Sequence, residues 1–107
     1  MTVNDVCKKI NADLVCGNLD KEFCGVYVGD LLSRAMSRVE SGNLWITIMS
    51  NINIIAVATL ADPACIVLAE DVELDADVLA KAEREGVNVL SSALDSFALC
   101  AKISELI

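Results

Sequence analysis

Two short, nearly continuous apolar runs, residues 46–49 and 66–68, constrain the fold of this chain more than any other feature of its sequence. Strands that are buried on both faces of a parallel sheet read as continuous apolar runs, whereas half-exposed strands alternate apolar and polar residues. Segments with the apolar spacing of helices lie between the strand-like runs. Because parallel strands need crossover connections, this alternation predicts an α/β fold: a three-layer α/β/α domain with a mainly parallel sheet.

The individual elements are predicted from apolar spacing and from residues that start or stop helices. The expected strands span residues 14–16, 23–28, 44–49, 65–69 and 87–90, and the expected helices span residues 3–10, 31–39, 51–61, 75–85 and 92–106. Thr2 and Asp30 can cap their helices, Ser92 with Asp95 resembles a capping box, and Gly86 suits a helix end. The β-branched segment 51–61 could also form a strand, but no turn separates it from the preceding strand, so we interpret it as a helix.

The size and composition of the chain indicate one domain, residues 1–107, that associates with a second copy. Hydrophobic residues make up 55% of the sequence, above the roughly 45–50% of an average protein, and a small domain tends to cover such an excess by self-association. The expected helix 51–61 is apolar on two faces. One face would pack on the sheet, and Ile54, Val57 and Ala61 on the other would form the interface of a homodimer.

The charge of the chain argues against several classes of partner. It has 16 acidic and 8 basic residues, a formal net charge of −8, which would repel nucleic acid and anionic membrane surfaces. The apolar run 54–61 is far shorter than the roughly 20 residues that span a bilayer. Polar residues near the start of the sequence interrupt any signal-peptide pattern, so we expect a cytoplasmic protein.

The side chains available for catalysis are few. The chain has no histidine, so no Ser-His or Cys-His pair can form, and we expect neither an enzyme nor a cofactor. The five cysteines show no Cys-x-x-Cys spacing and no zinc-site pattern, so we interpret them as small hydrophobic core residues in a reducing compartment. A cysteine-based redox sensor remains an alternative. The cysteines are Cys7, Cys16, Cys24, Cys65 and Cys100.

Candidate binding residues lie where helices follow strands, because ligands of parallel sheets bind outside the carboxyl ends of the strands. The corners are Gly29-Asp30, Ser50-Asn51, Glu70-Asp71 and Ser91-Ser92. One hypothesis is that Ser50, Asn51, Ser91 and Ser92 line a pocket for a nucleotide or another small anion, with Gly29 and Asp30 beside it. No phosphate-binding glycine motif supports this, and ordinary helix capping explains the same residues. A magnesium site formed by Asp20, Asp30, Glu70 and Asp71 is a weaker alternative, because scattered acids usually serve solubility.

Several stretches along most of the chain resemble those of DRTGG-domain proteins, related in fold to the N-terminal domain of HPr kinase/phosphorylase. They are residues 12–17, 19–25, 27–33, 42–47, 53–58 and 85–87. In the segment that resembles the motif after which the family is named, Asp20 and Gly25 match its ends, Lys21 stands where Arg is usual, and Val26 replaces the final glycine. The resemblance implies a stand-alone regulatory module that contacts a protein partner or a second copy, as relatives linked to anaerobic metabolism and hydrogenase systems would.

Overall fold

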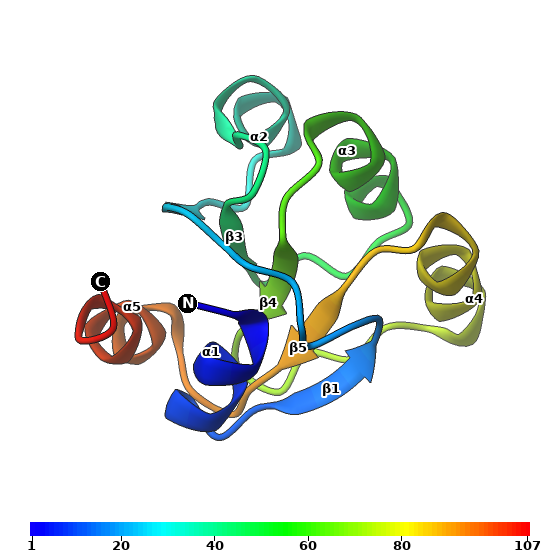
Figure 1. Cartoon of the computed structure of the whole chain (residues 1–107). Coiled ribbons are helices and arrows are strands. Elements are labelled where there is room, and N and C mark those ends of the chain that lie inside the picture. The colour runs from blue at the N-terminus through cyan, green and yellow to red at the C-terminus, as the bar shows by residue number, and fades with distance from the viewer.

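A computed structural model, which describes residues 1–107, shows one five-stranded sheet in the order β1-β5-β4-β3-β2 (Figure 1). Strands β2 to β5 are parallel to their neighbours, and only β1 runs antiparallel, beside β5. The predicted α/β fold with a mainly parallel sheet is therefore confirmed. The strands are β1 (Asp13–Cys16), β2 (Val26–Val28), β3 (Leu44–Thr47), β4 (Cys65–Leu68) and β5 (Val89–Ser91).

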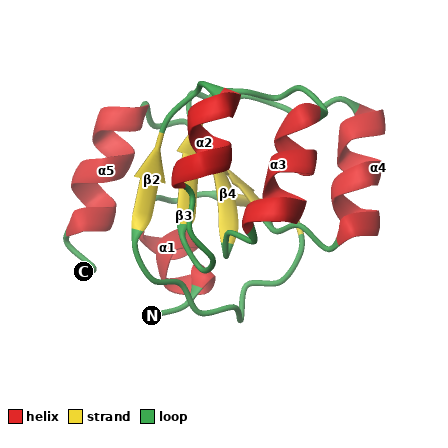
Figure 2. Cartoon of the chain, turned by 90° about the horizontal axis from the view of Figure 1, so that it is seen from above, coloured by secondary structure: helices red, strands yellow, loops and turns green.

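Helices cover both faces of the sheet. Figure 2 shows α2, α3 and α4 side by side on one face, and Figure 1 shows α1 and α5 on the opposite face. The buried side chains accordingly form two hydrophobic clusters, one on each side of the sheet. The helices are α1 (Val3–Lys9), α2 (Leu32–Arg38), α3 (Asn53–Ala61), α4 (Ala76–Glu85) and α5 (Ser96–Ser104).

The central strands supply both clusters, because successive side chains of a strand point to opposite faces. In β3, Trp45 packs under α2 and α3, whereas Leu44 and Ile46 face α1 and α5. In β4, Ile66 and Val67 divide in the same way. All residues of β3 and β4 are buried, which confirms the interpretation of residues 46–47 and 66–68. Ile48 and Met49 lie beyond the end of β3, and Ile48 is exposed.

Two predicted elements differ most from the bounds in the structure. The strand expected at residues 23–28 begins only at Val26. The helix expected at residues 92–106 begins at Ser96, and its cap is Asp95, whose carboxylate accepts a hydrogen bond from the Ala98 amide at 2.8 Å. Ser92 is no cap, because its buried hydroxyl donates to the carbonyl of Ile10 at 3.2 Å. The predicted Ser92–Asp95 capping box is therefore wrong.

Segment 51–61 forms a helix as predicted, but the proposed interface on it is wrong. Ile54 and Val57 are 0% and 3% exposed within a single copy, and Ala61 is half-buried. The reason is that α3 lies between α2 and α4 on the sheet, so its sides as well as its base are covered (Figure 1). Leu60 on α3 and Ile52 just before it are exposed to solvent.

No helix of the structure has the length and apolar character needed to cross a membrane.

Candidate functional site

The carboxyl ends of β2 to β5 lie along the same side of the sheet, because these strands are parallel. We call this side the carboxyl edge. The four predicted corners occur in the order of the sheet: Ser91-Ser92, of which Ser91 is the last residue of β5, Glu70-Asp71 after β4, Ser50-Asn51 after β3 and Gly29-Asp30 after β2. The sequence therefore predicted correctly at which strand end each pair lies. The hydrogen bonds at the carboxyl edge show whether the side chains of these pairs are free to bind a ligand.

The corner after β2 ties two strands together. The Asp30 carboxylate accepts hydrogen bonds from the Thr47 hydroxyl at 2.8 Å and from the Ile48 amide at 2.9 Å, both at the end of β3. The carbonyl of Gly29 accepts a bond from the Trp45 indole at 3.1 Å. The predicted capping of α2 by Asp30 is wrong, because its carboxylate is bound to β3 and α2 has no side-chain cap. Both residues of this corner stabilise the fold.

The serine and asparagine corners also bond to the protein itself. The Asn51 side-chain oxygen accepts from the Asn53 amide at 2.9 Å, just where α3 begins, and Ser50 is half-buried beside it. The Ser91 hydroxyl donates to the Val72 carbonyl at 3.3 Å. Ser92 is only 2% exposed, so its hydroxyl is out of reach of a ligand. Hydrogen bonds within the protein therefore account for Asn51, Ser91 and Ser92 without a bound anion.

The largest cavity, about 540 Å³, opens at this same edge between β1 and the segment that follows β4. Of the six predicted ligand residues only Ser91 lines it. Its lining includes three carboxylates, Asp13, Asp71 and Glu73, which repel an anion at short range. The cavity lining comprises Asp13, Val15, Asp71, Val72, Glu73, Leu74 and Ser91.

The backbone amides beside this cavity are already used. The amides of Glu70 and Asp71 donate to the carbonyls of Leu94 and Ser92, each at 2.9 Å. An anion site at a strand end usually depends on free backbone N–H groups, and these two cannot serve. The acids considered for magnesium, Asp20 among them, do not converge, because no group of three or more potential ligands lies close enough to hold a metal ion.

The motif segment lies at the amino ends of the parallel strands, opposite the carboxyl edge. β1 and β2 are consecutive in sequence but form the two outer strands, so residues 17–25 cross the amino ends of β5, β4 and β3 (light blue in Figure 1). The Asn18 amide donates to the side chain of Asn88, next to β5, at 2.7 Å. The Cys24 amide donates to the Gly42 carbonyl, before β3, at 2.8 Å. We call residues 17–25 the crossover strap.

The motif residues themselves anchor this strap. The amide of Asp20 donates to the Asn18 side chain at 2.7 Å and forms a local turn. Lys21 lies 3.9 Å from the Asp62 carboxylate, before β4. Gly25 has φ of +77°, and an added Cβ would lie 2.8 Å from the Asn43 side-chain nitrogen. These positions hold a chain crossing in place, which is a structural task.

The sequence profile of the DRTGG domain family matches residues 5–106. The chain belongs to the DRTGG domain family. The family resemblance predicted from the motif and the spacing of the landmarks is thereby confirmed, even though Lys21 and Val26 depart from the motif. No curated protein matches the chain significantly.

One solved structure shares the DRTGG fold with a TM-score of 0.76 and 14% sequence identity. It contains the CBS and DRTGG domains of the regulatory region of Clostridium perfringens pyrophosphatase, complexed with its activator diadenosine tetraphosphate. The alignment covers 95% of this chain but only 45% of that one. The present chain thus spans less than half of that regulatory region, and at this identity the likeness shows the fold alone.

Two structural residues of the DRTGG domain went unnoticed in the sequence. Asn43 and Asn88 are 8% and 9% exposed and precede β3 and β5. Asn43 donates to the Cys24 carbonyl at 2.8 Å, and Asn88 donates to the Ala64 carbonyl at 2.9 Å. The signal that could have found them is the placement of an asparagine directly before an apolar strand, where a buried amide needs a backbone partner.

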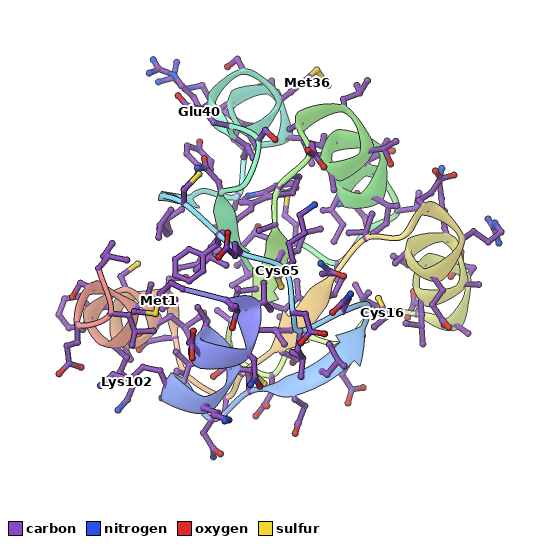
Figure 3. All side chains as sticks on the ribbon, viewed as in Figure 1. Met1, Cys16, Met36, Glu40, Cys65 and Lys102 are labelled. Carbon is purple, nitrogen blue, oxygen red and sulfur yellow. The ribbon has the colours of Figure 1, made fainter.

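The five cysteines differ in their environments. Figure 3 shows Cys65 within the sheet and Cys16 between β1 and α4, and both are buried. Burial raises the pKa of the Cys65 and Cys16 thiols above the ordinary value. Burial also raises the pKa of the half-buried Cys7, with a contribution from the Asp13 charge. Core packing explains Cys16 and Cys65, whereas Cys24 is exposed.

Proposed function

We propose that this DRTGG domain is a regulatory module in the cytoplasm that acts by binding, and that it works as a homodimer. Membership in the family supports the regulatory role, and a DRTGG domain occurs in the regulatory region of the pyrophosphatase. The proposal does not include catalysis. The side chains of Asp30, Asn51, Ser91 and Ser92, near the carboxyl ends of the parallel strands, form hydrogen bonds with other groups of the protein.

The observation that carries the proposal is the amount of apolar surface that one copy leaves exposed. Ten large hydrophobic side chains are at least 40% exposed in a single copy, and exposed apolar surface that is contiguous commonly marks contacts with other proteins. In this proposal the exposed apolar surface binds a second copy of the chain and a protein partner. The exposed residues are Met1, Leu14, Val28, Leu31, Met36, Ile48, Ile52, Leu60, Phe97 and Ile107.

Sedimentation equilibrium of the purified domain tests the homodimer. The expected result is a species of twice the 11.4 kDa chain mass at tens of micromolar, dissociating on dilution. A single species of 11.4 kDa at that concentration would contradict the dimer. Chemical crosslinking at the same concentration gives an independent reading.

A small-ligand sensor is the second candidate, and the cavity at the carboxyl edge favours it. Its volume of about 540 Å³ lies within the roughly 300–1,000 Å³ range of small-molecule sites. Because Asp13, Asp71 and Glu73 line it, a nucleotide would need cations to balance its phosphates. Calorimetric titration with diadenosine tetraphosphate and adenine nucleotides, with and without Mg²⁺, tests this. Absence of heat under both conditions removes the nucleotide.

A redox sensor is the third candidate, and Cys24 is the cysteine best placed for it, because it is exposed whereas Cys7 and Cys100 are half-buried. Its thiol lies 3.8 Å from the Ser41 carbonyl, in the loop before β3. Rapid reaction of Cys24 with peroxide, accompanied by a change in oligomeric state, would support this role. Slow oxidation of all five thiols in the folded protein would eliminate it.

A further inference from the structure

Strand β2 forms a free edge of the sheet. It pairs only with β3, and the flanking hydrogen bonds are Leu44 amide to Gly25 carbonyl at 3.0 Å and Gly29 amide to Ile46 carbonyl at 3.1 Å. Backbone groups of a strand alternate between its two sides, so Tyr27 also faces β3. The N–H and C=O groups of Val26 and Val28 therefore face away from the sheet. They offer a second strand four hydrogen-bonding groups.

This edge lacks most of the features by which proteins usually protect an edge strand, although β2 is only three residues long and a short edge strand is one of them. β2 reads Val-Tyr-Val, with no proline, no charge and no bulge, although each of these is a common device against strand pairing. The other edge strand, β1, is different. It carries Asp13, its register shifts between Leu14 and Cys16, and Asp71 and Glu73 line the cavity beside it. Only the β2 edge is open to pairing.

An apolar groove of about 240 Å³ runs beside this edge, between β2 and α5. Phe97, which is 83% exposed, lies three and seven residues before Cys100 and Ser104, so it shares their face of α5. The groove and Phe97 extend the apolar surface of the free edge onto the neighbouring helix. The groove is lined by Val26, Val28, Cys100, Ile103, Ser104 and Ile107.

The distribution of charge favours a second copy at this end of the molecule. The chain carries a net charge of −8, yet β2, α2 and α5 contain none of its 16 acidic residues, and only Asp30, Glu40, Asp95 and Glu105 lie within two residues of them. These elements contain three of its 8 basic residues, Arg34, Arg38 and Lys102. By contrast, seven acidic residues fall within residues 70–85, at the opposite end of the sheet. Two copies that meet through β2 therefore keep their acidic ends apart.

We propose that β2 pairs antiparallel with β2 of a second copy, about a twofold axis at Tyr27, to give a continuous ten-stranded sheet. Val26 then lies opposite Val28 of the second copy, and the two symmetric pairs exchange four backbone hydrogen bonds. In this arrangement the α5 helices of the two copies lie on the same face of the sheet. The groove and Phe97 of each copy are then covered by those of the other copy. The inference rests on the proposed homodimer and identifies its surface.

Three substitutions of equal charge test the surface by sedimentation equilibrium. V28K places a charge beside the paired strands, and F97K places one on the exposed face of α5. L60K is the matched control, because Leu60 is 75% exposed on α3, away from β2. We expect V28K and F97K to weaken dimerisation at least tenfold and L60K to leave it unchanged. If V28K does not fold, F97K still decides, since Phe97 contributes little to the core.

Hydrogen exchange supplies a measurement of the pairing itself. The amides of Val26 and Val28 should exchange at least tenfold more slowly in concentrated protein than in dilute protein, while the Leu14 amide in β1 should not change. A wild-type monomer would overturn both the homodimer and its surface. A dimer that V28K and F97K leave intact, with unchanged exchange in β2, would overturn the surface and leave the homodimer standing.

Discussion

The side chain of Asn88 joins three segments that are far apart in the sequence. It accepts from the Asn18 amide at 2.7 Å and donates to the Ala64 carbonyl at 2.9 Å. An added Cβ on Gly17 would lie 2.1 Å from its oxygen, so the crossover strap packs directly on it. A single buried amide therefore sets the path by which the chain leaves β1.

N88A should lower the free energy of unfolding by about 1–3 kcal/mol, because it leaves the buried Ala64 carbonyl without its partner and removes the hydrogen bond from the Asn18 amide. Urea denaturation followed by circular dichroism measures the change. N53A is the control, since Asn53 is exposed at the start of α3, and it should stay within about 0.5 kcal/mol of the wild type. Equal losses in the two variants would show that the strap does not depend on Asn88.

The buried thiol of Cys65 should make stability depend on alkaline pH. Burial raises its folded pKa above the ordinary value of 9.0, so above pH 9 the unfolded chain loses a proton that the folded chain keeps. The free energy of unfolding should then fall by about 1.4 kcal/mol for each pH unit, starting near pH 9. Denaturation at pH 8 and pH 10 tests this. C65A should show a smaller fall between the two, and an identical fall would exclude the thiol as its cause.

At the scale of helices and strands, local patterns predicted the elements whose causes are local. The buried strands β3 and β4 and the amphipathic helix α4, which ends at Gly86 with φ of +69°, were expected from apolar spacing and capping residues. The strand predicted from residue 23 failed because Phe23 is buried for another reason. It packs in the α1–α5 cluster as part of the crossover strap. Its burial depends on the strand order, which no local pattern records.

The candidate site shows the same division. The rule for parallel sheets correctly placed Asp30, Asn51 and Ser92 where helices follow the strands. The sequence could not show that Asp30 bonds to β3 or that the Ser92 hydroxyl reaches Ile10, because these contacts join residues 17 and 82 positions apart. Long-range hydrogen bonds decide whether such a side chain is free for a ligand.

Helix α5 depends on one capping residue that the sequence analysis assigned to another role. D95A removes the acceptor of the Ala98 amide and should destabilise the protein by about 1 kcal/mol. D75A is the matched control, because Asp75 is the N-cap residue of α4 but makes no side-chain cap bond. We expect its effect to stay below about 0.5 kcal/mol. Thermal unfolding of both variants compares them, and equal shifts would contradict the assignment of the cap.

At the scale of the whole molecule, charge and apolar surface lie at opposite ends of the sheet. The β1 end carries the cavity with its three carboxylates and the acidic segment 70–85, whereas the β2 end carries the apolar groove. Because the charged and apolar surfaces are separated, the β2 end can associate with a second copy while the β1 end stays solvated. It also separates the two proposed activities, because a ligand in the cavity would not compete with a second copy at β2.

The salt dependence of dimerisation follows from this arrangement. Each copy carries a net charge of −8, so bringing two copies together costs long-range repulsion that salt screens, with a Debye length of about 10 Å at 0.1 M. The β2 face itself supplies backbone hydrogen bonds and apolar contacts, which salt does not weaken. Dimerisation should therefore tighten several-fold between 20 mM and 500 mM NaCl, measured by sedimentation equilibrium. An interface built on ion pairs, such as α2 arginines against the acidic segment of a second copy, would weaken instead. Weaker association at high salt would thus argue for that head-to-tail contact and against pairing of the β2 strands.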